Sequence, residues 1–190
     1  MMSVSKQGGI TMKKYIEPFD YAQQILSGVQ KGALVTGAAN GRVNPMTISW
    51  GMMGIEWGKP VFIVFVRESR FTRSLLEANP EFTINIPFGE VDKDILRVCG
   101  SKSGRDMDKI AELGLTLETP DTVSVPGIKE LPLTLECRVV YKQDQDLKAI
   151  TPDNLEKYYP QDVPGDYCGS NRDFHIAYYG QIVSAYIIED

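Results

Sequence analysis

The chain has 190 residues, the length of one ordinary domain, and 43% of them are hydrophobic, which is enough to bury a core. The formal net charge is −5 and basic residues are interspersed with acidic ones, so the composition excludes a general nucleic-acid-binding surface. No apolar run approaches the ~18 residues that cross a bilayer, so we expect no membrane partner.

The first half of the chain predicts a tail, a helix, a hairpin and a buried strand, in that order. Residues 1–11 are expected to be a flexible N-terminal tail, because they lack the apolar core of a secretory signal, and one domain is expected at 12–190. The patterns that follow are a helix at 18–27, strands at 32–37 and 44–50 joined by the Asn40-Gly41 hairpin signal, a strongly apolar strand at 60–66 and a helix at 72–79.

The second half continues with short elements. It predicts a strand at 81–87, helices at 92–98 and 106–113, a long strand at 131–143 and one or two strands at 173–188. A polar insertion at about 145–171 carries one or two helical turns near 152–158. Because the strands do not alternate regularly with helices, we expect a mainly β protein with small helices. A closed or nearly closed antiparallel barrel is favoured, with α+β layers as the alternative.

Cysteine and histidine counts limit the possible chemistry. Cys99, Cys137 and Cys168 are far apart and lack C-x-x-C spacing, so neither a disulfide framework nor a zinc site is expected, and a cytoplasmic location fits best. His175 is the only histidine, so we expect no metal, and it is the one catalytic candidate. A lone histidine beside apolar residues is more often a hydrogen-bonded core or surface residue. An enzyme of this composition would need a cofactor for its chemistry.

Three segments carry polar groups suited to a ligand. The strand around 44–51 places the hydroxyls of Thr47 and Ser49 on one face, which would suit either a solvated sheet face or the floor under a planar ligand. The segment 67–74 puts three arginines and three hydroxyl groups where a strand gives way to a helix, a place where anions collect, although a solvated cap is the alternative. The segment 99–106 combines Gly, Ser, Lys and Arg as anion-binding loops do, but such runs are often simple turns.

Taken in this order, the segments resemble the flavin reductase-like family of FMN-binding split barrels, which includes flavoredoxin. The resemblance runs from about Pro18 to the C-terminus. It rests on Gly32-Ala33-Leu34-Val35-Thr36, Asn44-Pro45-Met46-Thr47-Ile48-Ser49-Trp50, Pro60-Val61-Phe62 through Ser69-Arg70-Phe71-Thr72, Phe82-Thr83-Ile84-Asn85-Ile86-Pro87, and Cys99-Gly100-Ser101 through Asp108-Lys109.

The resemblance implies a six-stranded antiparallel split barrel of Greek-key type, paired into a homodimer with FMN near the interface. It also implies three groups of cofactor-binding residues. These are Met46, Thr47, Ile48, Ser49 and Trp50 beside the ring, Arg67, Ser69, Arg70 and Thr72 on the phosphate side, and Ser101, Lys102 and Ser103 in a second phosphate-side loop.

The function implied is that of an oxidoreductase, an NAD(P)H-dependent flavin reductase that passes hydride to flavin N5. No G-x-G-x-x-G fingerprint is present, so NADH or NADPH would bind transiently over the flavin. Two alternatives stay open: an FMN-containing electron carrier that serves a partner protein, and a non-enzymatic barrel that binds another ligand.

Overall fold

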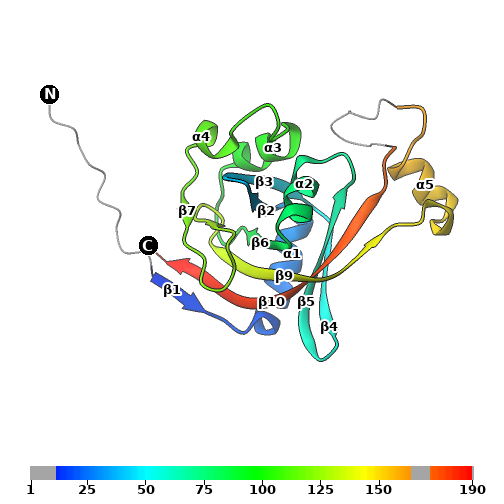
Figure 1. Cartoon of the computed structure of the whole chain (residues 1–190). Coiled ribbons are helices and arrows are strands. Elements are labelled where there is room, and N and C mark those ends of the chain that lie inside the picture. The colour runs from blue at the N-terminus through cyan, green and yellow to red at the C-terminus, as the bar shows by residue number, and fades with distance from the viewer. Residues whose placement is uncertain (1–11, 164–171, 190) are drawn as a thin grey trace, which may run out of the picture.

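The computed structural model describes residues 12–163 and 172–189, and all its strand pairings are antiparallel (Figure 1). The strands are β1 Met12–Tyr15, β2 Ala33–Ala39, β3 Arg42–Ile48, β4 Gly51–Glu56, β5 Lys59–Arg67, β6 Glu81–Ile86, β7 Leu117–Glu118, β8 Gly127–Ile128, β9 Leu133–Asp144 and β10 His175–Glu189. The helices are α1 Ala22–Lys31, α2 Phe71–Ala78, α3 Lys93–Ser101, α4 Lys109–Leu113 and α5 Pro152–Tyr158, with 3-10 turns η1 Pro18–Tyr21 and η2 Leu147–Ala149.

The main sheet has eight strands, and its order forces it to curl. Along the sheet the order is β3-β2-β6-β9-β10-β5-β4, and β1 pairs with the far end of β10. β3 and β4 therefore lie at opposite edges, yet only Ser49 and Trp50 separate them in the chain. A link of that length reaches roughly 11 Å at most, so the two edges must meet at this point. The sheet is closed there, and Ser49 and Trp50 lie at the seam.

The predicted mainly β antiparallel architecture is confirmed, but the predicted strand number of six is too low. β4 escaped prediction because Gly51 and Gly54 interrupt any alternation of apolar and polar residues. β1 escaped because it is four residues long and mostly exposed. The hairpin predicted at Asn40-Gly41 is present, with positive φ at both residues, which is the backbone of a tight hairpin turn.

The buried side chains of the sheet and of α1 and α2 form one apolar core, and α3 and α4 cover a smaller one beside it. The predicted helices 72–79 and 92–98 correspond to α2 and α3, although α3 continues to Ser101. The helix predicted at 106–113 begins later, at Lys109, because Asp108 caps its N-terminus through hydrogen bonds from two main-chain amides. No helix within the described ranges is long and apolar enough to cross a membrane.

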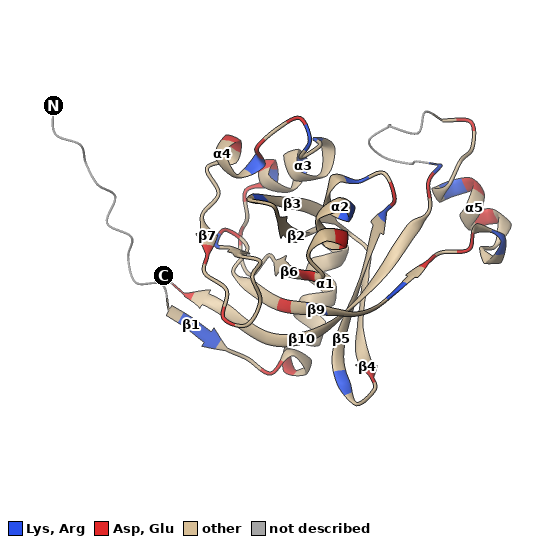
Figure 2. Cartoon of the chain, viewed as in Figure 1, with Lys and Arg blue, Asp and Glu red and all other residues tan. Residues whose placement is uncertain are grey.

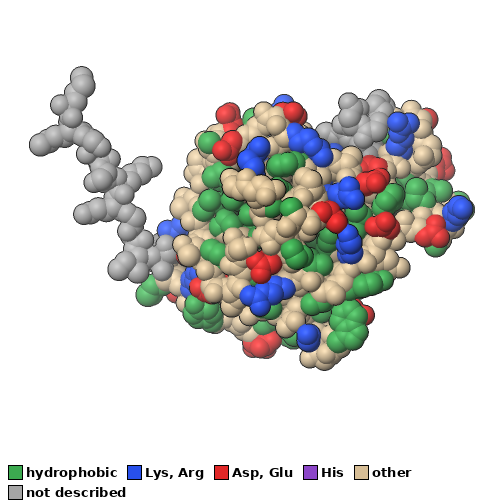
Figure 3. All heavy atoms as spheres, viewed as in Figure 1, with side chains coloured by type: hydrophobic (Ala, Val, Ile, Leu, Met, Phe, Trp, Pro, Cys, Tyr) green, Lys and Arg blue, Asp and Glu red, His purple; other side chains and the backbone are tan. Residues whose placement is uncertain are grey.

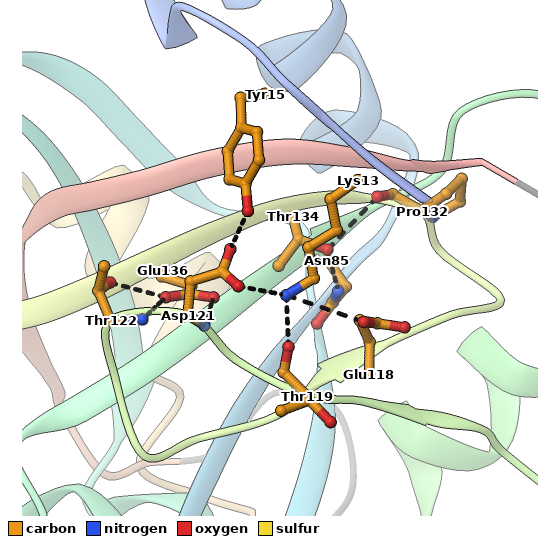
Figure 4. A network of polar contacts seen from close by, with 10 residues as sticks. All are labelled: Lys13, Tyr15, Asn85, Glu118, Thr119, Asp121, Thr122, Pro132, Thr134 and Glu136. Atoms are coloured by element: carbon orange, nitrogen blue, oxygen red, sulfur yellow. Dashed lines mark hydrogen bonds and ion pairs between the residues drawn. The ribbon is translucent and has the colours of Figure 1, made fainter. Parts of the chain in front are cut away.

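A polar cluster fixes β1 and the 118–122 loop to the sheet, and we call it the Lys13 network (Figure 4). The Lys13 ammonium lies 2.8 Å from Asp121 Oδ1 and 3.8 Å from Glu118 Oε1, and it also donates to the carbonyl oxygen of Thr119. Glu136 on β9 is fully buried and accepts hydrogen bonds from the main-chain amides of Asp121 at 2.8 Å and Thr122 at 2.7 Å, and from the Thr122 hydroxyl.

Candidate functional site

A pocket of about 760 Å³ opens beside the seam of the barrel, a volume in the usual range for small-molecule sites. Four parts of the chain converge on it: the end of β3 with the link to β4, the end of β5 with the loop to α2, the end of α3 with the loop to α4, and the start of β10. It is lined by Met46, Thr47, Ile48, Ser49, Trp50, Phe65, Arg67, Ser69, Arg70, Phe71, Cys99, Gly100, Ser101, Lys102, Ser103, Gly104, Arg105, Asp106, Lys109 and His175.

The pocket brings together all the residues that the resemblance assigned to a cofactor, with the exception of Thr72. Thr72 is fully buried on α2, and its hydroxyl accepts a hydrogen bond of 2.9 Å from Asn44 Nδ2. It lies behind the pocket wall, whereas its neighbour Phe71 lines the pocket. Successive residues of a helix point in different directions, so the segment pattern alone could not separate the two.

The pocket is strongly basic although the whole chain is acidic. Among the residues that the structure describes, five cationic side chains and one carboxylate, that of Asp106, line the pocket, whereas the chain carries a net charge of −5. The cations are Arg67, Arg70, Lys102, Arg105 and Lys109. Elsewhere basic and acidic side chains are mixed over the visible face (Figures 2 and 3). A local excess of positive charge in a concave site favours an anionic ligand.

Ser69 supplies a second sign of a ligand. Its main-chain amide donates to Asp173 Oδ2 at 2.9 Å, and its carbonyl oxygen accepts a bond of 2.9 Å from Arg105, which joins the two loops. Its hydroxyl oxygen is buried and has no hydrogen-bond partner among the described residues. Because a buried polar group without a partner costs free energy, a hydroxyl in this position is suited to a ligand atom.

Gly104 allows the second loop to press against β3. A Cβ atom at Gly104 would come 2.0 Å from Asn44 Oδ1 and 2.7 Å from Phe71 Cδ1, so no other residue fits without displacement. Its carbonyl oxygen accepts a hydrogen bond of 2.6 Å from Arg42. The sequence predicted Gly104 as part of a candidate anion-binding loop or a simple turn, but not this close approach, because Asn44 and Phe71 come from distant parts of the chain.

Lys109 is a pocket residue that the sequence prediction missed. Only 3% of it is exposed, and its ammonium donates to the carbonyl oxygens of Pro45 and Cys99 at 3.0 Å each. It therefore joins β3 to the end of α3 and places a buried positive charge in the wall. A lysine at the start of a short helix usually indicates a solvated face, so the sequence offered no signal for this arrangement.

His175 lies in the pocket wall, packed 5.0 Å from the Trp50 ring. Its Nδ1 is 2.8 Å from the Tyr159 hydroxyl, which also bonds to Gln145 Oε1 at 2.7 Å. Burial lowers the pKa of His175 to about 3, with the nearby Arg67 charge contributing in the same direction and the Asp173 charge opposing it. The imidazole is therefore neutral at ordinary pH, which argues against His175 as a charged proton donor.

Cys99 and Cys137 are buried and show no reactive character. Burial raises the pKa of Cys99 to about 11, with the charge of Lys109 opposing the shift, and burial raises the pKa of Cys137 as well. Cys168 lies outside the described residues. Within 12–163 and 172–189, no three His, Cys, Asp or Glu side chains are grouped as metal ligands would be.

The family model described as "Flavin reductase like domain" matches residues 27–190. The chain belongs to this family. An uncharacterised protein of Archaeoglobus fulgidus is 34% identical over 131 residues, which cover 69% of this chain and 66% of that protein. Over the curated relatives it matches, the chain spans from about half to two thirds of their length.

Three solved structures share the fold of this flavin reductase-like chain. Flavoredoxin from Methanosarcina acetivorans has a TM-score of 0.60 and 21% identity, covering 98% of this chain and 75% of that one. An FMN-binding domain of a flavin reductase-like enzyme from Shewanella baltica has a TM-score of 0.63 and 17% identity, covering 93% and 78%. An NADH:FAD oxidoreductase from Streptomyces globisporus has a TM-score of 0.57 and 16% identity, covering 93% and 90%. The predicted split-barrel class and family are confirmed.

Proposed function

We propose that this flavin reductase-like protein binds FMN in the 760 Å³ pocket and works as an NAD(P)H-dependent flavin oxidoreductase. The observation that carries the proposal is the excess of cationic side chains lining the pocket, which is also lined by Ser69, whose buried hydroxyl has no hydrogen-bond partner among the described residues. Arginine forks and hydroxyl groups make strong, charge-assisted hydrogen bonds to phosphate. The phosphate would lie between the two loops, held by Ser69, Arg70, Ser101, Lys102 and Ser103.

The ring would lie against the end of β3 and the seam. Met46, Thr47, Ile48, Ser49 and Trp50 line this side with main-chain groups and side chains. The Thr47 hydroxyl donates to the carbonyl oxygen of Leu96 at 2.7 Å, so it is fixed in place and presents its lone pairs to any ligand donor. The FMN-binding domain from Shewanella baltica, which shares the fold, supports the choice of FMN.

Bound FMN would supply the redox chemistry, with hydride arriving from NADH or NADPH at flavin N5. The chain's own residues would bind the phosphate, orient the ring and shield one face of it. His175 is neutral, so it would act as a wall residue with a hydrogen-bonding imidazole and not as a charged acid. The NADH:FAD oxidoreductase from Streptomyces globisporus, which shares the fold, supports a nicotinamide donor.

The test is a visible spectrum of the purified protein, an FMN titration, and then anaerobic addition of NADH or NADPH. We expect flavin absorbance or saturable FMN binding, followed by bleaching with one of the nicotinamides. Absence of flavin absorbance and of FMN binding would reject the proposal. Tight FMN without bleaching would favour the electron carrier, which the similarity in fold to flavoredoxin supports.

We also propose a homodimer that uses the β4–β5 hairpin. Three large apolar side chains of this hairpin are well exposed: Met52 at 56%, Ile55 at 72% and Trp57 at 60%. Met52 and Ile55 lie on opposite faces of β4, so the hairpin exposes apolar side chains on both faces, which a partner subunit could cover. Sedimentation should show a dimer, and the double substitution Ile55→Ser with Trp57→Ser should shift it toward monomer; a monomeric unaltered protein would reject the dimer.

A further inference from the structure

Arg67 was expected to contact the phosphate, but its guanidinium is directed to the main chain of the insertion. One terminal nitrogen donates to the carbonyl oxygen of Asp173 at 2.6 Å, and the other donates to the carbonyl oxygen of Tyr158 at 2.8 Å. The same group lies 3.7 Å from the Asp173 carboxylate. Only 7% of Arg67 is exposed. The arginine therefore joins the end of β5 to Tyr158 within the insertion and to Asp173 just after it.

Tyr158 and Tyr159, at these contacts, support two aromatic residues of the pocket wall, Trp50 and His175. Tyr158, the last residue of α5, packs edge-on against Trp50 with ring centroids 5.1 Å apart. Tyr159 packs beneath the Arg67 guanidinium at 5.0 Å and against His175 at 5.6 Å. Trp50 in turn packs on His175. We call Trp50, Tyr158 and His175 the aromatic rim.

Trp50 sits where the main pocket meets a second one. A hollow of about 520 Å³ shares Ser49, Trp50 and Phe65 with the main pocket, and its other walls are mostly apolar. The orientation of Trp50 therefore decides how wide the main pocket is on the side away from the phosphate loops. Trp50 is 38% exposed, so its neighbours Tyr158 and His175 supply much of what fixes it.

We propose that Arg67 is a positioning residue, which sets the aromatic rim through the Tyr158 carbonyl and thereby determines how tightly the pocket holds the ring of its ligand. This inference rests on the proposed function. A guanidinium suits the task because its planar fork reaches two carbonyl oxygens at once, whereas a lysine ammonium is a point charge on a flexible stem. The insertion thus supports the ring site through Tyr158 and Tyr159, which lie in its described part.

Comparing FMN with riboflavin, which lacks the phosphate, separates positioning from phosphate binding. In Arg67→Gln we expect the affinities for both flavins to fall by a similar factor, roughly tenfold, as for the loss of one or two hydrogen bonds. In Arg67→Lys the affinities for both flavins should fall by a similar factor, because lysine keeps the charge but lacks the planar guanidinium that reaches two carbonyl oxygens. The matched variant Arg70→Gln should lose affinity for FMN and leave riboflavin unchanged.

Tyr158→Ala provides the second variant. It leaves Arg67 in place and removes the rim ring, so it should weaken both flavins equally. The double variant with Arg67→Gln should lose little more flavin affinity than Tyr158→Ala alone, since both substitutions act through the position of the Tyr158 ring. Tryptophan emission of the ligand-free protein, in a Trp57→Phe background that leaves Trp50 alone, should shift to the red in Arg67→Gln as the rim loosens.

The outcomes distinguish the two proposals. If the unaltered protein binds neither flavin, the proposed function is rejected, and the inference about Arg67 is rejected with it if Trp50 emission is also the same in Arg67→Gln. If the unaltered protein binds both flavins and Arg67→Gln loses FMN alone, Arg67 is a phosphate ligand and the inference is overturned. Full binding of both flavins by Arg67→Lys would overturn it too.

Discussion

The flavin pocket and the Lys13 network are both rich in charge, yet they differ in how the charge is satisfied. In the Lys13 network the ammonium lies among two carboxylates and a carbonyl oxygen, and the Glu136 carboxylate receives three hydrogen bonds from Asp121 and Thr122. In the pocket, five cationic side chains and one carboxylate line the wall among the described residues, and one further carboxylate, that of Asp173, lies 3.7 Å from Arg67.

This difference separates a structural cluster from a ligand site. Buried polar groups that are matched within the protein rigidify the fold and need no further partner. In a concave site with surplus charge of one sign, that charge is neutralised when a ligand of opposite charge binds. The two regions lie at opposite ends of β10, near Tyr186 and near His175. Substitutions at the first should therefore change stability, and substitutions at the second should change ligand affinity.

Glu136→Gln should give the largest effect. The carboxylate is fully buried and accepts from two amides and one hydroxyl, and an amide group would direct its own N–H toward one of these donors. We expect a loss of about 2–4 kcal/mol in the free energy of unfolding, measured in urea, with FMN affinity unchanged. The exposed Glu112→Gln on α4 is the control. A Glu136 variant as stable as the control would show that the network is not a structural cluster.

Arg70→Ala should change ligand affinity and leave stability nearly unchanged, the reverse of the pattern for Glu136→Gln. Loss of a charge-assisted contact should weaken FMN binding by about 1.5–3 kcal/mol and leave the free energy of unfolding within the range of surface substitutions. Arg97→Ala is the matched control, since Arg97 is exposed on α3 and paired only locally with Asp94 in the contacts described. Titration with FMN, followed by absorbance, measures the FMN affinity of both variants. Equal affinity in the two variants would move the phosphate away from this loop.

The sequence predicted which segments line the pocket, but it did not predict the contacts between their side chains and distant residues. Strand ends and loops at 44–51, 67–74 and 99–106 carried visible signals, because Ser, Thr, Gly and Arg cluster within a few residues of one another. The partners of Arg67 could not be seen in this way, since Tyr158 and Asp173 are 91 and 106 positions away. The role of a long-range side chain depends on the tertiary fold, and a local pattern does not encode it.

The fold shows the same limit. Strands with regular alternation, such as 81–87, were predicted, while the glycine-interrupted β4 and the short β1 were not. Lys13 in particular falls at the start of the predicted domain with nothing nearby to suggest its role. Its partners come more than 100 positions later, Glu118 at the end of the two-residue strand β7 and Asp121 in the loop that follows, where the sequence has no regular pattern.

The single histidine allows a test at the pocket end of β10. Folding lowers the pKa of His175 from 6.5 to about 3, so the unfolded state binds the proton more strongly. The stability due to neutral His175 is therefore complete above pH 6.5 and is lost as the pH falls from there toward 3. The unfolding midpoint of the unaltered protein should fall over this interval more steeply than that of His175→Gln. In NMR spectra of the unaltered protein, the imidazole signals of His175 should not titrate near neutral pH. Titration there would mean that the ring is solvated.

Lys13→Ala should give the smallest effect and so tests the comparison most finely. The ammonium bonds to Asp121 and Thr119 and lies 4.3 Å over the Tyr186 ring, but it belongs to a four-residue edge strand at the surface. We expect a loss of about 1 kcal/mol or less in the free energy of unfolding, together with faster amide exchange in β1. Lys14→Ala, on the opposite face of the same strand, should change neither. If Lys13→Ala instead altered flavin affinity, the two ends of β10 would be coupled and the separation of structural cluster from ligand site would fail.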